Sequence, residues 1–413
     1  MTALNLDHIR AEFPALAGGF VFLDNAGGSQ VLARVADRVR DYLLTTSVQL
    51  GASYGHSQLA GERVLQARRA MAELINAPDD EEVVIGPATT AMMLRLTLAL
   101  RSQIAPGDEI IVTNTDHEAN VGCWTRLADA GAVIKVWPIN RDSLRLELED
   151  LQALLSPRTK WVAMTLASNV LGTVNPVQDV VRLAHGAGAR VCVDAVAYAP
   201  HRLVDVQALG VDVLVLSLYK VFGPHQAVLW GRRELLASLT NLNHYFIGMD
   251  EVPYKLQPGS VNYELSYGCL GINDYLCAVG TRLGKDLGNS GTPRQLMQAA
   301  FDAFAEHEDA LAERLLAWLR GVKGVRIIGL PTAAGGHRVP TISFVVEGRR
   351  SEDIVTRMDA HGIGIRFGDF YARRLIEALD LGPYGGVVRV SIAHYNTMAE
   401  IERLVARLSE IIG

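Results

Sequence analysis

The fold is decided by residues 190–224, RVCVDAVAYAPHRLVDVQALGVDVLVLSLYKVFGP. Arg190–Val193 is a short apolar run that ends at Asp194, and Val211–Leu216 is a second apolar run that ends shortly before Lys220. Runs rich in Val and Leu with little alternation predict strands buried on both faces, as in a parallel sheet covered by helices. Because ligands bind at the carboxyl ends of the strands in such sheets, Asp194 and Lys220 are expected at one ligand-binding edge.

A carboxylate and a lysine at one sheet edge are the two groups that a pyridoxal phosphate site needs most. The lysine bonds to the cofactor's aldehyde as a Schiff base, and the acid keeps the pyridine nitrogen protonated, so that the ring can accept electrons from Cα of a substrate. Two other interpretations fit the pair alone. Strand-end aspartates such as Asp194 often cap helices, and a lysine next to an aromatic residue, as in Tyr219-Lys220, often lies at a solvated strand end. The other motifs have to decide between these interpretations.

Length and composition predict a soluble enzyme with two domains. A chain of 413 residues exceeds one ordinary hydrophobic core. Hydrophobic residues make up 49% of it and charged residues 20%, and the net charge is -6, with Lys and Arg scattered along the chain. This charge pattern argues against nucleic acid as a partner and against binding to a membrane surface.

The N-terminal residues and the cysteines indicate the compartment. Residues 1–16 contain no basic region followed by an apolar core, and no apolar run in the chain reaches the roughly 18 residues of a spanning helix. We therefore expect a cytoplasmic protein. The four cysteines, Cys123, Cys192, Cys269 and Cys277, form no Cys-x-x-Cys pair, so they support neither a disulfide framework nor a metal site.

The order of the predicted elements indicates an α/β fold. Strands alternate with helices from about Val83 to Leu216, which predicts a large, doubly wound, mainly parallel sheet. Residues 288–293, GNSGTP, have the composition of a linker, and a long amphipathic helix and a smaller α+β unit follow. We predict a large cofactor-binding domain over residues 15–290 and a small domain formed by residues 1–14 and 291–413.

The small domain is expected to be a sheet with helices. Its predicted strands are Val325–Ile328, Thr341–Val346, Ile363–Phe367 and Val387–Ala393, and its predicted helices are Ser351–His361 and Met398–Ile411. The short N-terminal helix, Leu6–Phe13, is expected to pack against this domain.

Two polar segments follow predicted strands of the large sheet. Thr89 and Thr90 come after a strand at residues 82–86 and open a helix, where hydroxyls and backbone amides can hold a phosphate. The simpler interpretation, a threonine N-cap, is favoured when the segment is taken alone. His117 follows a strand at residues 109–113, where it can lie flat on an aromatic cofactor or be an ordinary polar loop residue.

Short motifs follow one another along nearly the whole chain. They are Leu23-Asp24-Asn25-Ala26, Thr89-Thr90, Asp116-His117-x-Ala119-Asn120, Ser168-Asn169-Val170-Leu171-Gly172-Thr173, Val193-Asp194, Ser217-x-x-Lys220-x-x-Gly223-Pro224 and Arg389-x-Ser391-x-x-x-Tyr395-Asn396-Thr397. In this order they resemble the class V aminotransferase and cysteine desulfurase family of fold-type I pyridoxal phosphate enzymes. The resemblance implies the fold-type I transferase fold and pyridoxal 5'-phosphate as the cofactor.

The resemblance assigns the groups around the cofactor ring. Lys220 is similar to the Schiff-base lysine, which also moves the proton at Cα, and burial is expected to lower its pKa. Asp194 would pair with the pyridine nitrogen, and His117 would stack on the ring. Asn169 is similar to the residue that donates a hydrogen bond to the ring's 3′ oxygen.

The resemblance also assigns phosphate ligands. Thr89, Thr90 and Ser217 match phosphate-binding positions of the family. Ser260 matches a position that reaches the phosphate of the neighbouring subunit. A homodimer with shared active sites is therefore implied.

The expected substrate is a small amino acid. Arg389 matches the arginine that binds the α-carboxylate, a role suited to its planar, bidentate group. Asn25 is expected at the substrate as well. Arg366 would either bind a second acidic group of the substrate or brace its loop through an ion pair with Asp369.

The sequence departs from the desulfurase pattern at the sulfur nucleophile. In residues 365–371, IRFGDFY, Tyr371 stands where desulfurases carry the cysteine that forms a persulfide. Tyr219 stands where histidine is common, and Ala197 where desulfurases carry a glutamine. Tyr371 is expected either to exchange a proton near Cβ or to be an aromatic plug in place of the cysteine.

The sequence therefore predicts a desulfurase-like enzyme that acts at Cα and Cβ of a small amino acid through Lys220, His117 and Tyr371. β-Elimination of the C–S lyase type is the favoured reaction. Class V aminotransfer and epimerisation are the alternatives, because the fold alone does not choose among them. A non-catalytic scaffold that retains the fold is the alternative of a different class.

Overall fold

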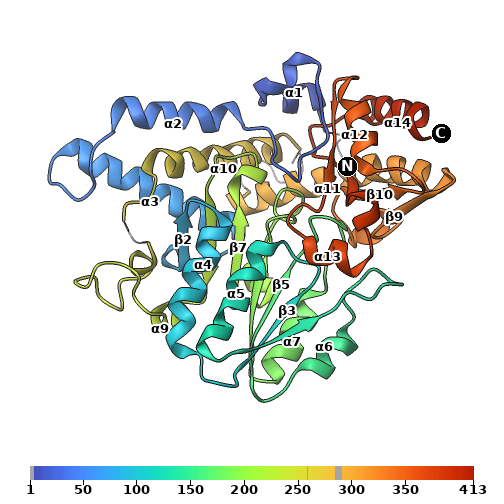
Figure 1. Cartoon of the computed structure of the whole chain (residues 1–413). Coiled ribbons are helices and arrows are strands. Elements are labelled where there is room, and N and C mark those ends of the chain that lie inside the picture. The colour runs from blue at the N-terminus through green and yellow to red at the C-terminus, as the bar shows by residue number, and fades with distance from the viewer. Residues whose placement is uncertain (1–3, 258, 284–290) are drawn as a thin grey trace.

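The computed structural model describes residues 4–257, 259–283 and 291–413 (Figure 1). Residues 288–290 of the predicted linker lie outside the described residues. Thr292, near the end of the predicted linker, caps the long helix α11 (Pro293–Gly321), because its hydroxyl accepts a hydrogen bond from the backbone N–H of Gln295 at 3.3 Å.

A seven-stranded sheet forms the centre of the larger part of the molecule. Its strand order is β2-β8-β7-β6-β5-β3-β4. Neighbouring strands are parallel, except that β8 runs antiparallel to β2 and to β7. The strands are β2 (Val83–Gly86), β3 (Glu109–Thr113), β4 (Val133–Trp137), β5 (Thr159–Thr165), β6 (Arg190–Asp194), β7 (Val213–Ser217) and β8 (Ala227–Gly231). The predicted mainly parallel α/β sheet is confirmed.

Helices cover both faces of this sheet, which explains the apolar runs of its strands. Successive residues point to opposite faces, so Val191 and Val193 enter one apolar core and Cys192 enters the other. Helices α4 and α5 pack on the face of Cys192 and lie in front of the sheet in Figure 1. The helices of this part are α2 (Ala33–Thr45), α3 (Gly55–Ile75), α4 (Thr89–Leu100), α5 (Gly122–Thr125), α6 (Leu148–Leu154), α7 (Val177–Gly186), α8 (Val206–Leu209), α9 (Arg233–Ser238) and α10 (Tyr263–Leu283).

A four-stranded antiparallel sheet forms the C-terminal part, in the order β12-β13-β10-β9. Its apolar core includes side chains of α11, α12 and α14. The elements are β9 (Val325–Ile328), β10 (Thr341–Val346), α12 (Ser351–Asp359), β12 (Arg366–Gly368), α13 (Arg373–Ala378), β13 (Val387–Ser391) and α14 (Met398–Ile412).

The strand predicted at residues 363–367 is divided in two. β11 (Ile363–Gly364) pairs in parallel with β1 (Val21–Phe22), whereas β12 pairs with β13. The division arises because the N-terminal segment, and not β13, forms the backbone hydrogen bonds of residues 363–364. For example, the N–H of Leu23 donates to the carbonyl of Gly364 at 2.9 Å.

The N-terminal helix α1 (Leu6–Ala11) contacts the C-terminal segment, as predicted. Arg10 donates to the carbonyl of Tyr395 at 2.8 Å and pairs with Glu400 at 3.0 Å. Phe13, just after α1, packs against Phe222 of the larger part as well, with ring centroids 5.8 Å apart. The division at residues 14 and 290 stays a prediction. None of the helices in the described part of the chain is both long and apolar enough to cross a membrane.

Candidate active site

A cavity lies at the carboxyl ends of β5, β6 and β7. Its empty volume, which includes space open to solvent, is about 520 Å³. Nearly all the residues predicted to bind the cofactor line it, namely Thr89, Thr90, His117, Asn169, Asp194, Ser217 and Lys220. Tyr219 and Ala197, at which the sequence departs from the desulfurases, line it too.

Lys220 ends a single 3-10 turn, Leu218–Lys220, directly after β7. The residue is 7% exposed, and no described residue accepts a hydrogen bond from its Nζ. Burial, assisted by the positive charge of Arg389, lowers the pKa of Lys220 to about 8, although Asp194 and Asp24 oppose the shift. The neutral, nucleophilic amine is therefore far more populated at pH 7 than for an ordinary lysine.

Asp194 ends β6 and is buried. Its Oδ1 accepts a hydrogen bond from the backbone N–H of Val196 at 2.8 Å. Burial raises the pKa of Asp194 to about 6, while the Val196 hydrogen bond and Lys220 act against the rise. The helix-cap interpretation does not hold, because turns follow Asp194 and the next helix begins only at Val206.

His117 follows β3 through a buried polar turn. Burial, followed by the charge of Lys220, lowers the pKa of His117 to about 4, which keeps the imidazole neutral at pH 7. Its Nδ1 accepts a hydrogen bond from the backbone N–H of Ala119 at 3.1 Å, so the proton sits on Nε2. Asp116, to which the sequence assigned no role, anchors this turn by accepting a hydrogen bond from Asn120 at 2.8 Å.

The start of α4 is open for an anion. Its N-cap is Ala88, which provides no side-chain cap, so the predicted alternative of a threonine N-cap is wrong. The hydroxyls of Thr89 and Ser217 lie 2.7 Å apart beside this helix end, and Thr90 is exposed. Free backbone amides, the helix dipole and two hydroxyls fit a phosphate group.

Taken together, these residues fit pyridoxal phosphate. The cavity offers an anion-binding helix end, a carboxylate for a ring nitrogen, a neutral imidazole and an amine without a hydrogen-bond partner in the described part of the chain.

Asn169 is engaged by the segment that carries Tyr371. Its side-chain Nδ2 donates to the backbone carbonyl of Phe370 at 2.9 Å. The backbone carbonyl of Asn169 accepts a hydrogen bond from Nη1 of Arg389 at 3.1 Å. The predicted bond from Asn169 to a ring oxygen therefore stays a prediction.

Arg389, on β13, lies close to the cavity but is not part of its lining. The residue is 2% exposed, and its Nη2 donates to Oδ1 of Asp24 at 2.8 Å. The ring of Phe370 covers one face of the guanidinium, with Cζ 3.7 Å from the ring centroid. Sequence reasoning missed both Asp24 and Phe370 as neighbours of Arg389.

Arg366 opposes Arg389 in the register of β12 and β13. Its side chain is 57% exposed, and Nη1 lies 3.5 Å from Oδ2 of Asp24. The alternative expectation, an ion pair with Asp369, is wrong. The Asp369 carboxylate lies 3.9 Å from Arg373 instead and accepts the backbone N–H of Tyr371.

Tyr371 is 71% exposed and lies beside His117, with ring centroids 5.2 Å apart. The ring is mostly exposed in this chain and is not part of the cavity lining, and its role, proton exchange or plug, stays a prediction. Phe370 and Tyr371 both have positive φ, 53° and 59°. Left-handed backbone is costly for such side chains, so the surrounding contacts must hold this turn.

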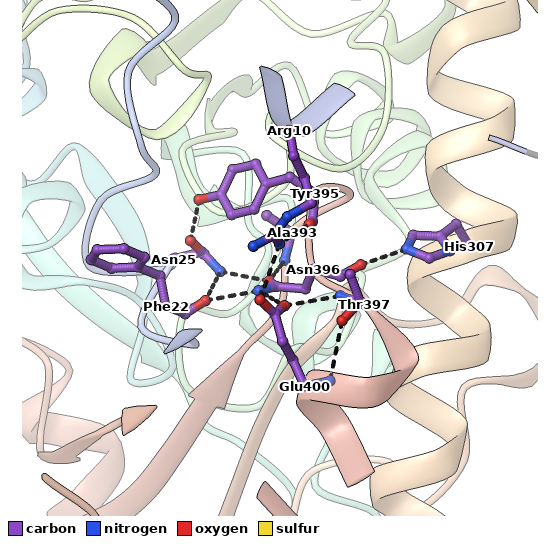
Figure 2. Close-up of polar contacts among 9 residues, drawn as sticks. All are labelled: Arg10, Phe22, Asn25, His307, Ala393, Tyr395, Asn396, Thr397 and Glu400. Carbon is purple, nitrogen blue, oxygen red and sulfur yellow. Dashed lines mark hydrogen bonds and ion pairs between the residues drawn. The ribbon is translucent and has the colours of Figure 1, made fainter. Parts of the chain in front are cut away.

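Asn25 is held in a hydrogen-bond network at the junction of the N-terminal segment and the start of α14 (Figure 2). Its Nδ2 donates to the carbonyls of Phe22 at 3.1 Å and Ser391 at 2.9 Å, and its Oδ1 accepts from the hydroxyl of Tyr395. Nδ2 is also 3.1 Å from Oδ1 of Asn396. The contacts of Asn25 are therefore structural, and its predicted substrate role stays untested.

Ser260 is exposed and lines a second depression, beside Gly86 and Pro87 at the turn before α4. Its predicted role toward a neighbouring subunit stays a prediction. Tyr219, which lines the active-site cavity, stacks on His225, which lines this second depression, with ring centroids 4.8 Å apart and planes at 6°.

The fold and this set of residues are those of a fold-type I, pyridoxal-phosphate-dependent enzyme. Residues 21–282 and 289–404 match the aminotransferase class-V family, and the chain belongs to this family.

Relatives that match over the full length carry different descriptions. The chain is 38% identical to the aminotransferase-like protein FGM3 of Gibberella zeae, over 100% of this chain and 99% of that protein. It is 33% identical to a cysteine desulfurase of Dickeya dadantii, over 98% of this chain and 96% of that protein. The crystal structure of the cysteine desulfurase CsdA of Escherichia coli superposes with a TM-score of 0.82 at 27% identity, covering 100% of both chains.

Proposed function

We propose that this protein binds pyridoxal phosphate through Lys220 and catalyses β-elimination from a small, cysteine-like amino acid. The observation that supports this most directly is the buried Lys220 amine, whose pKa is lowered to about 8, in one cavity with Asp194. Such a pair suits the removal of a proton from Cα.

When bound, the cofactor supplies an aromatic ring that accepts electron density from Cα of the amino acid. Asp194 would hold a proton at the pyridine nitrogen, and neutral His117 would contact the ring. Thr89, Ser217 and the N-terminus of α4 would bind the phosphate. Lys220 would bond to the aldehyde.

Lys220 removes the proton from Cα, and Arg389 binds the α-carboxylate of the amino acid. For L-cysteine, the Cα–H and Cβ–S bonds break, and water completes the conversion to pyruvate, ammonia and sulfide. The ring centroids of Tyr371 and His117 lie 5.2 Å apart. A movement of the Tyr371 turn would bring the phenol to the edge of the site, where it would exchange a proton with the substrate. Burial of Lys220 and Asp194 limits access of water to these groups.

The state of the cysteines supports elimination over persulfide transfer. Burial raises the pKa of Cys123 to about 12 and that of Cys277 to about 11, and it raises the pKa values of Cys192 and Cys269 as well. A thiol must ionise to attack sulfur, so these environments disfavour a persulfide carrier.

Aminotransfer is the second candidate. The full-length similarity to an aminotransferase-like protein favours it. The two reactions differ in their needs, because transamination requires a keto-acid acceptor and releases no ammonia.

The active unit that we propose is a homodimer in the cytoplasm, with the domain division given above. The exposed position of Ser260 beside the turn that precedes the phosphate-binding helix supports a shared site.

A product assay tests the reaction. We expect the purified holoenzyme to release pyruvate and ammonia from L-cysteine or an S-substituted cysteine without a keto acid, and Lys220→Ala to release neither. If product forms only when a keto acid is added, and no ammonia is released, the reaction is transamination and not elimination. A protein-bound persulfide after incubation with L-cysteine would contradict the proposal.

A further inference from the structure

Arg389 is closed off on several sides. Asp24 and the carbonyl of Asn169 accept hydrogen bonds from its two terminal nitrogens, and the Phe370 ring lies on its face. Its Nε is buried and has no hydrogen-bond partner among the described residues. A carboxylate could satisfy this nitrogen, but one of the three neighbours has to withdraw first.

Phe370 is the one of these three neighbours that makes no hydrogen bond to Arg389. Asp24 makes a charge-assisted hydrogen bond, and the Asn169 carbonyl belongs to a buried backbone segment. Phe370 contacts Arg389 through its ring, which also packs against the apolar cluster that contains Leu375, and its backbone φ of 53° is followed by 59° at Tyr371. Movement of the whole turn lets its backbone leave the left-handed region, whereas withdrawal of Asp24 leaves two arginines without their shared counter-ion.

Two hydrogen bonds join the turn of Phe370 to the cavity. The Phe370 carbonyl accepts from Asn169 Nδ2 at 2.9 Å, and the Tyr371 carbonyl accepts the backbone N–H of Glu118 at 2.7 Å. Glu118 follows His117, so the turn is tied to predicted cofactor ligands on both sides. Movement of the turn changes the hydrogen bonding of those segments.

We propose that Phe370 is a specificity-determining gate for the α-carboxylate of the substrate. The carboxylate displaces the ring from Arg389, and residues 369–371 separate from Asn169 and Glu118. The gate accepts free α-amino acids and discriminates against amides and esters, whose neutral ends compete poorly for the guanidinium. This inference rests on the proposed role of Arg389 as the carboxylate ligand.

Phe370→Leu tests the gate, because leucine retains an apolar side chain but loses the arginine contact. Calorimetric titration of the holoenzyme with L-alanine should show roughly threefold to thirtyfold tighter binding by the variant. L-Alaninamide should show no gain. Tyr267→Leu is the matched control, because it removes another arginine-aromatic contact, with Arg63 Cζ 4.7 Å from the ring, outside the cavity lining. Unchanged or weaker L-alanine binding by Phe370→Leu would show that the ring does not compete with the substrate carboxylate for Arg389, and would overturn the proposal.

Hydrogen exchange of the wild-type holoenzyme tests the same inference without a variant. L-Alanine should accelerate exchange of the Glu118 amide, since its acceptor on Tyr371 withdraws, and L-alaninamide should not. Equal protection with and without L-alanine, or no L-alanine binding to either protein, overturns the proposal. Neither measurement depends on product formation, so an inactive pyruvate assay with accelerated exchange would reject the elimination reaction and retain the gate.

Discussion

The carboxylate of Asp24 accepts a hydrogen bond from Nη2 of Arg389 at 2.8 Å, although 365 residues separate the two. Its other oxygen lies 3.5 Å from Arg366. One carboxylate near the N-terminus thus pairs with both Arg366 and Arg389 of the C-terminal sheet. The position of Arg389 is therefore set by residues from opposite ends of the chain.

Asp24→Asn should lower the free energy of unfolding by about 1–3 kcal/mol, because Arg389 loses its charged partner while buried. Arg366→Gln should cost less than about 1 kcal/mol, since that arginine is largely exposed. Urea unfolding of both variants checks the difference. Equal losses would mean that burial of Arg389 does not depend on Asp24.

Lys220→Ala should abolish the visible absorbance of the lysine-bound cofactor and all product formation, because no amine remains to bond to the aldehyde. Absorbance spectra of the purified proteins check this. Lys160→Ala is the control, because Lys160 is half-exposed and its one ion pair among the described residues is with Asp108, at 3.8 Å. A coloured, active Lys220→Ala protein would exclude Lys220 as the cofactor lysine.

Labelling of Lys220 by an amine-reactive reagent in the cofactor-free protein should depend on pH. Only the neutral amine reacts, so the rate should rise about tenfold per pH unit and level off above the pKa of about 8. Asp194 raises the pKa of Lys220, so Asp194→Asn should move the plateau to lower pH. Peptide mass spectrometry measures both profiles. A plateau only near the usual lysine range would contradict the buried environment.

Asn25→Ala should lower stability by about 2–4 kcal/mol, because the buried groups around it lose several hydrogen bonds. Tyr395→Phe, which removes one of these bonds, should cost about 1–2 kcal/mol. Thermal unfolding compares the two variants. A raised KM with unchanged stability would instead support the predicted substrate role of Asn25.

Alkylation by iodoacetamide at neutral pH should be slow at all four cysteines, because burial raises their pKa values. Cys277 should react before the others, since it alone is partly exposed. Mass spectrometry of intact protein counts the labels. Rapid labelling coupled to loss of activity would point to a reactive thiol and revive the persulfide route.

Residues 190–224 correctly predicted a mainly parallel sheet. Strands that are buried on both faces of such a sheet are continuous apolar runs, and ligand-binding polar groups follow at their carboxyl ends. The motifs along the chain then named most of the residues that line the cavity. The divided strand at residues 363–367 was beyond sequence reasoning, because its pairing partner, Val21–Phe22, lies at the other end of the chain.

The sequence alone therefore determined the sheet, the family and the groups at the strand ends, since these follow from local composition and short motifs. Only the tertiary structure decided that Asn25 forms hydrogen bonds between the N-terminal and C-terminal segments. It also decided that Asp24 pairs with both Arg366 and Arg389, and that the Phe370 ring covers Arg389. The physical reason is that the contacts of Asn25 and Asp24 join segments hundreds of residues apart, while the contact of Phe370 depends on how its turn folds back onto β13. No local spacing records which side chains meet when the N-terminal segment packs against the C-terminal sheet.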